Sequence, residues 1–119
     1  MESYINKILF GNEITISFYI DHEQPAAVAN AIHKKLPDVE MNGYNWDAVL
    51  VCYLEENQPD LLTDFDSDPE AEMYTAMYSD TPENRERADA LCALLEELCE
   101  DEEILCSFVQ EYADEIAWD

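Results

Sequence analysis

Residues 4–20, YINKILFGNEITISFYI, decide the fold. In the second half of this stretch, apolar residues alternate with polar or aromatic ones at Ile14, Ile16, Phe18 and Ile20. A period of two is typical of a strand with one buried face. The dipeptide Gly11-Asn12, just before it, favours a tight turn. We therefore predict a hairpin of two strands, over residues 4–10 and 13–20.

Two helices are predicted to follow this hairpin. The first runs from residue 21 to about residue 36, with Asp21 as its N-cap. A loop over residues 38–45 leads to the second helix, which covers about residues 46–57 and has Asn45 as its cap. Apolar residues of this second helix recur at the three- and four-residue spacing of one helical face.

A second hairpin and a helical C-terminal region complete the chain. The strands are predicted at residues 63–67 and 72–78, around a turn at Asp68-Pro69. Thr81 then caps a helix that starts with a proline, an arrangement that helix N-termini favour. The acidic run at residues 100–103 predicts a break before a last helix over 101–116; one long helix over 82–116 is the alternative.

The element order is therefore β-β-α-α-β-β-α-α, which indicates an α+β fold. Strands that come in consecutive pairs favour an antiparallel or mixed sheet, here of about four strands. With about four helices on one face, the architecture is a two-layer sandwich. A length of 119 residues suits one domain, so residues 1–119 are predicted to form a single unit.

The net charge is the strongest indication of function. The chain has 29 acidic and five basic residues, a formal charge of −24 at pH 7. Nineteen of the acids follow residue 60. Such a field repels the phosphates of nucleic acids and the anionic surface of membranes. It attracts basic proteins over long distances, so we expect a basic protein partner and an interaction surface in the second half.

Several patterns bear on location. The N-terminus lacks the basic region and apolar run of a secretory signal, and no apolar stretch is long enough to span a membrane. The four cysteines form no CxxC pair and are expected to be free and reduced. These patterns predict a cytoplasmic protein.

An acidic segment, DFDSDPEAE at residues 64–72, is the candidate binding site. Its alternate acids are reminiscent of a calcium loop, but Pro69 occupies the glycine position and Thr75 the position of the bidentate glutamate. We interpret the acids instead as contacts for Arg and Lys of a partner, with neighbouring aromatics as anchors. The predicted contact residues are Asp64, Phe65, Asp66, Asp68, Glu70, Glu72, Tyr74 and Tyr78.

Catalysis has little support in the sequence. His22 and His33 are the only histidines, and neither lies in a nucleophile or metal-binding motif. Two glycines cannot build a glycine-rich phosphate loop. We predict no catalytic residue, no metal site and no cofactor.

Three segments resemble a known family. They are GYNW at residues 43–46, YLEENQPDL at 53–61 and DFDSDPEAEMYTAMYSD at 64–80, followed by a leucine-rich acidic C-terminal region. Together they are similar to the immunity protein 51 family of bacterial polymorphic toxin systems. The resemblance implies a protein that binds a secreted toxin domain in the cytoplasm and blocks it.

The charge is compatible with that implication, because nucleases, which are frequent toxins, need basic surfaces to hold phosphates. We therefore expect an immunity protein that neutralises a basic, nuclease-like toxin. The alternative is an acidic nucleic-acid mimic that inhibits a host or phage nucleic-acid-binding protein.

Overall fold

The computed structural model describes residues 4–119 and confirms the predicted α+β fold and its element order. A four-stranded sheet has the strand order β1-β2-β4-β3, and all neighbouring strands are antiparallel. Its strands are β1 (Ile5–Phe10), β2 (Glu13–Phe18), β3 (Asp66–Pro69) and β4 (Tyr74–Ser79). Both hairpins follow the predicted pairing, and β1 and β3 are the two edges.

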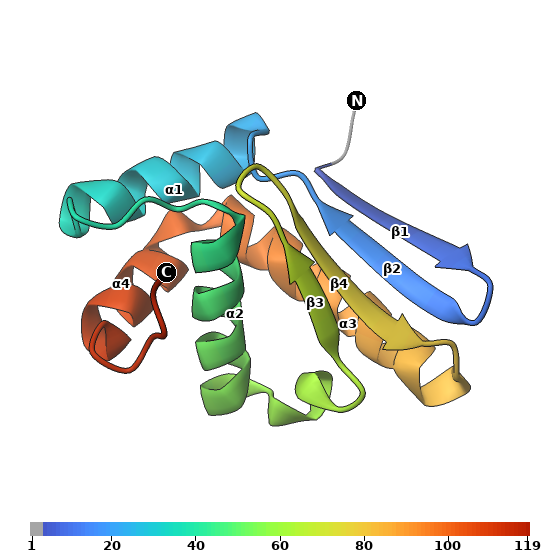
Figure 1. Cartoon of the computed structure of the whole chain (residues 1–119). Helices are drawn as coiled ribbons and strands as arrows, with labels where there is room; N and C mark the ends of the chain where they lie inside the picture. Colours follow the sequence, from blue (N-terminus) through green and yellow to red (C-terminus); the bar gives the residue numbers. More distant parts are fainter. Residues whose placement is uncertain (1–3) are drawn as a thin grey trace.

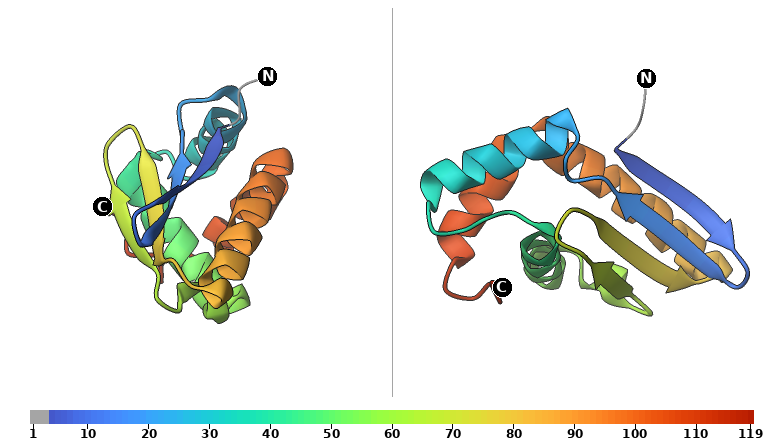
Figure 2. Two further views of the ribbon diagram at one scale, coloured as in Figure 1. Left: turned by 90° about the vertical axis from the view of Figure 1, so that its right-hand side faces the viewer. Right: turned by 45° about the horizontal axis from the view of Figure 1, so that its top comes forward.

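Four α-helices and one short 3-10 helix complete the part of the chain that the structure describes. They are α1 (Glu23–Lys35), α2 (Gly43–Asn57), η1 (Pro59–Leu62), α3 (Pro82–Glu100) and α4 (Glu102–Tyr112). Figure 1 shows α3 running behind the sheet, with α2 beside β3 and the pair α1 and α4 beyond the end of the sheet. The left view of Figure 2 shows the strands on one side and α3 on the other.

The core lies between the sheet and these helices. Cross-strand pairs of β2 and β4 point into it, including Phe18 opposite Tyr74 and Ile14 opposite Tyr78. Trp46 of α2 is fully buried and meets the ring of Phe18 edge-on, at a centroid distance of 5.0 Å. The apolar residues that alternate in residues 13–18 therefore form the buried face of β2, as the sequence predicted, because this face packs against the helices.

The C-terminal helices are two, not one. Asp101 separates α3 from α4, and its carboxylate accepts a hydrogen bond from the N–H of Glu103 at 3.2 Å. The acidic run therefore marks a helix start, as predicted, although α4 ends at Tyr112 rather than near residue 116.

Several predicted boundaries are corrected. His22, not Asp21, is the N-cap of α1, because a turn between His22 N–H and the Tyr19 carbonyl keeps Asp21 outside the helix. Helix α2 begins one turn earlier than predicted, with Asn42 accepting from the N–H of Asn45 at 2.9 Å. Asn45 is thus inside the helix, not its cap.

The second hairpin is shifted along the chain. A turn over residues 60–65 occupies most of the predicted strand 63–67, and Asp64 has a positive φ of 55° there. Pro69 lies in β3 opposite Tyr74, a position that an edge strand tolerates. The turn between the strands therefore falls at residues 70–73 rather than at Asp68-Pro69.

Candidate functional site

One face of the sheet carries none of the helices found in residues 4–119, as the left view of Figure 2 shows, and we call it the open face. Strand register brings its side chains into rows across the four strands. One row is Ile8, Thr15, Met77 and Asp66, and the next is Asn6, Ser17, Thr75 and Asp68. The open face therefore has two acids at the β3 edge, mostly small polar residues together with Met77 in the middle, and Asn6 and Ile8 at the β1 edge.

The acids at the β3 side are the predicted contact residues Asp66, Asp68, Glu70 and Glu72, and all four are exposed. We call this set the acidic edge. Asp66 and Asp68 point to the open face, whereas Glu70 and Glu72 lie in the turn that follows β3. Among residues 4–119, no ion pair involves any of the four. Their charges are therefore available to a partner.

Asp64 and Phe65 have structural contacts in addition to their predicted role. The Asp64 carboxylate accepts a hydrogen bond from Nδ2 of Asn84 at 3.3 Å, which ties the turn to the first part of α3. Phe65 is half-buried and its ring lies 5.8 Å from that of Tyr78. Asp64 is thus less suited than Asp66 or Asp68 to a free contact with a partner.

Tyr74 and Tyr78 require a correction. Both point to the helix side of the sheet and are 1% exposed. The Tyr78 hydroxyl donates to the Leu61 carbonyl at 2.6 Å, while the Tyr74 ring packs beside Phe18. A docking partner does not reach either residue, so neither is an anchor on the surface.

The ionisation of these tyrosines agrees with a core role. Burial, and then the nearby Asp47 carboxylate, raises the pKa of Tyr74 well above its usual value. Burial also raises the pKa of Tyr78, although the Arg87 guanidinium opposes the shift. Both hydroxyls therefore stay protonated and serve as hydrogen-bond donors.

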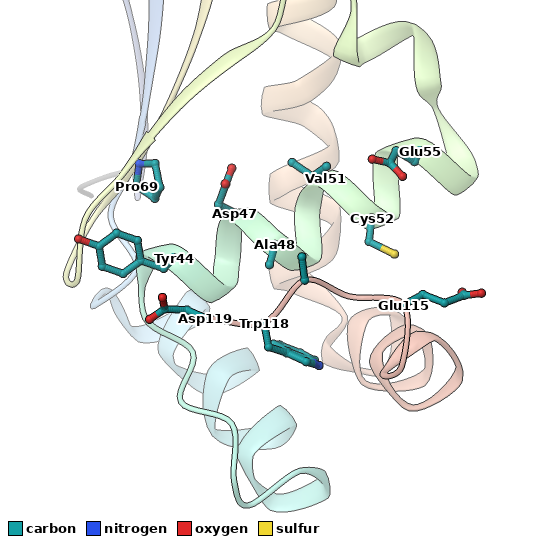
Figure 3. Close-up of a pocket in the computed structure, with 11 residues that line it drawn as sticks. Tyr44, Asp47, Ala48, Val51, Cys52, Glu55, Pro69, Glu115, Trp118 and Asp119 are labelled. Atoms are coloured by element: carbon teal, nitrogen blue, oxygen red, sulfur yellow. The ribbon is translucent and has the colours of Figure 1, made fainter.

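A groove lies next to the β3 edge, between α2 and the last residues of the chain. It has a volume of about 390 Å³, and Pro69 of β3 forms part of its wall. Figure 3 shows the aromatic rings of Tyr44 and Trp118 at its sides. Four carboxylate side chains also line it: Asp47, Glu55, Glu115 and Asp119.

Sequence reasoning did not identify this groove, because its walls are about sixty residues apart in the chain. The C-terminal residues reach α2 through a hydrogen bond from the N–H of Asp119 to Oδ1 of Asn45, at 2.7 Å. The indole N–H of Trp118 donates to the Ala113 carbonyl at 3.0 Å. The only sequence signal was a tryptophan in an otherwise acidic terminal segment.

Basic side chains do little to offset the acids. Three of the five are in ion pairs: Lys7 with Asp89, Arg85 with Asp80, and Arg87 with Asp60. Hydrogen bonds from Arg85 lower the pKa of Asp80, so that carboxylate is already engaged. The surface of the chain therefore stays strongly negative, most of all in its second half.

The histidines make local contacts. Nδ1 of His33 lies 2.9 Å from the Val39 carbonyl, at the end of α1. The ring of His22 lies 5.7 Å from that of Tyr19. Within residues 4–119, no three His, Cys, Asp or Glu side chains are grouped so as to hold a metal ion. None of the helices in that same range has the length and apolarity that a membrane crossing requires.

Comparison with known proteins gives one family. The family model described as immunity protein 51 matches residues 8–114, nearly the whole chain. No curated protein and no solved structure matches this chain.

Proposed function

The chain belongs to the immunity protein 51 family, and from that membership we propose that it binds and neutralises a basic toxin domain through the open face and the acidic edge. The match over residues 8–114 is the observation that carries this proposal. We also propose that the toxin is a nuclease, and that the two proteins meet in the cytoplasm.

The distribution of charge supports a basic partner. Asp66, Asp68, Glu70 and Glu72 are exposed and form no ion pair with any residue from 4 to 119, and the groove beside β3 adds four more carboxylates. Charge-assisted hydrogen bonds from Arg or Lys to such carboxylates are strong and directional. A net charge of −24 also accelerates the encounter with a positively charged surface.

A nuclease is the toxin class that fits this surface best. An enzyme that holds phosphates needs a basic substrate site, and an acidic protein that covers that site excludes the nucleic acid. The chain itself then needs no catalytic residue, no cofactor and no affinity for nucleic acid. It acts in a one-to-one complex, so protection depends on the amount of protein and not on turnover.

Co-expression with the toxin domain encoded beside this gene tests the proposal. We expect the chain to restore growth and to co-purify with that domain at equal stoichiometry. A toxin domain inactivated in its active site is the control for expression burden. If the chain neither restores growth nor co-purifies, the toxin-neutralising function is refuted for this pairing, and the nucleic-acid mimic becomes the account to test.

A further inference from the structure

Strand β1 carries a run of exposed large hydrophobic residues. Of the four exposed large hydrophobic residues between residues 4 and 119, three are consecutive in β1. They are Ile8, Leu9 and Phe10, which are 45%, 52% and 80% exposed. Exposed apolar residues gathered in one strand are more often an interaction site than isolated ones are.

The backbone of β1 also has unused hydrogen-bonding groups. The N–H of Tyr19 donates to the Tyr4 carbonyl at 2.8 Å, so Tyr4 and Tyr19 are a hydrogen-bonded pair of the antiparallel ladder. In an antiparallel ladder such pairs alternate, so Asn6 and Ile8 bond to β2, whereas the N–H and C=O groups of Lys7 and Leu9 point outward. An added strand would find donors and acceptors at these two residues.

The two edges of the sheet differ in their protection. Strand β3 has four residues, two of them acids, and it ends in Pro69, which offers no N–H. Strand β1 has six residues in continuous register, without proline or bulge. Its one charged residue, Lys7, is paired with Asp89 of α3. Nothing in β1 therefore blocks the approach of another strand.

Acids of α3 run alongside β1 on its helix side. Helix α3 contacts β1, and Asp89 of α3 forms an ion pair with Lys7. Besides burial, the Asp89 and Glu96 carboxylates raise the pKa of the Cys92 thiol in α3, whereas the Lys7 ammonium lowers it. Besides burial, Glu96 and Glu100 likewise contribute to the raised pKa of Tyr4, the residue just before β1. The β1 edge is thus bordered by the α3 acids Asp89, Glu96 and Glu100. A second copy of this chain would bring two such rows together, each on a molecule of charge −24.

We propose that β1 pairs with an extended segment of the toxin domain, which adds a fifth strand to the sheet. Backbone groups of Lys7 and Leu9 hold the segment, apolar side chains cover Ile8 and Phe10, and Lys or Arg side chains face the acids of α3. This inference rests on the proposed function and assigns a second part of the interface, at the sheet edge opposite the acidic edge.

Substitution of Leu9 provides the test with the toxin domain encoded beside this gene. Leu9→Pro removes the outward N–H without removing a bond to β2, and we expect a Kd at least about tenfold higher. Leu9→Ala keeps that N–H and is the matched control; its Kd should rise by less than about threefold, because the Leu9 side chain points to the helix side and not toward the apolar contacts at Ile8 and Phe10. Thermal melting checks that both variants are folded.

Hydrogen exchange of the unaltered protein gives a second, independent readout. In the free protein, the amides of Lys7 and Leu9 should exchange fast and that of Ile8 slowly, and the complex should protect Lys7 and Leu9. Equal affinities of the two variants, or fast exchange of both amides in the complex, overturn the inference while toxin binding stands. Protection of these amides in the free protein through self-association also overturns it. If the unaltered chain does not bind the toxin domain, the proposed function fails, and the inference fails with it.

Discussion

At the scale of single residues, Gly43 joins two of the three segments that carry the family resemblance, residues 43–46 and 64–80. It is the first residue of α2, and its N–H donates to the Ala71 carbonyl in the β3–β4 turn at 3.2 Å. A Cβ atom at this position would overlap the carbonyl oxygens of Glu70 and Met73. The GYNW segment therefore supports the turn that holds the acidic edge, and glycine is required there for space.

Replacement of Gly43 by alanine should therefore destabilise the fold. The added methyl group forces α2 and the turn apart, and overpacking of this kind costs about 3 kcal/mol in the free energy of unfolding. Urea denaturation measures the difference. Gly11 offers a control, because it has a positive φ of 62° and open space around it; Gly11→Asn should be close to neutral. Equal stability of Gly43→Ala and the unaltered protein would contradict the packing argument.

Cys99 gives a prediction about ionisation. Its thiol is buried, and burial raises its pKa from 9.0 to about 12. At pH 8 the reactive thiolate is therefore much rarer in the folded protein than in the unfolded one, and alkylation should be at least about a hundredfold slower. Mass spectrometry of protein alkylated with iodoacetamide, native or in urea, measures the rate. Similar rates in both states would mean that the thiol is accessible.

The same shift has a consequence for stability at high pH. A proton is held more tightly by Cys99 in the folded state, so this stabilisation is complete below pH 9 and is lost as the pH rises toward 12. The pKa of Tyr4 is also raised, to about 12, chiefly by burial. We expect the melting temperature to fall over this range, and to fall less in Cys99→Ala. An identical decline in that variant would exclude Cys99 as a contributor.

At the scale of elements, period and turn chemistry were sufficient to predict the first hairpin and the pairing of both, but they placed the turn of the second hairpin too early in the chain. They could not fix which residue caps a helix when several candidates are close together. Asn42 and Asn45 are equivalent by residue type, and Asn45 is drawn inside α2 by hydrogen bonds to the Glu40 carbonyl and from the Asp119 N–H. The second partner, Asp119, is 74 residues away in the chain, so no local pattern reveals it.

In the candidate site, too, local sequence predicted some features and long-range packing decided the others. Exposure of Asp66 and Asp68 followed from their alternation in an acidic strand. The burial of Tyr74 and Tyr78 did not, because α2 and α3 decide which side of β4 faces the core. The register that places β1 and β3 at opposite edges depends on long-range pairing of β2 with β4. The open face is therefore a property of the assembled sheet.

The junction between α3 and α4 supplies a prediction at this scale. Asp101 caps α4 through the N–H of Glu103. Asp101→Ala should lower the free energy of unfolding by about 1 kcal/mol relative to Asp101→Asn, which keeps a capping oxygen. Both variants remove the same charge, so their difference in urea denaturation isolates the cap. No difference between them would show that the acidic run separates the helices without the cap.

At the scale of the whole molecule, the balance of charge should govern stability. With 29 acids and five bases, repulsion among carboxylates opposes the compact state. Added salt screens this repulsion, and mild acidification reduces it. The melting temperature near neutral pH should therefore rise with sodium chloride concentration. A fall would mean that attractive pairs dominate, which the three ion pairs found in the described part of the chain are too few to provide.

The central claim is that the acidic edge receives a basic toxin domain, and association kinetics test it most directly. Asp66→Asn/Asp68→Asn removes two charges from the open face without disturbing the contact between Asp64 and Asn84. Glu111→Gln/Asp114→Asn removes the same charge from exposed residues in and just after α4, an element away from the sheet, and is the control.

Stopped-flow measurements with the toxin domain encoded beside this gene would follow the association of both variants. We predict that at low salt the first variant associates several-fold more slowly than the control, and that the difference disappears at high salt. Equal association rates of the two variants at low salt would contradict the account.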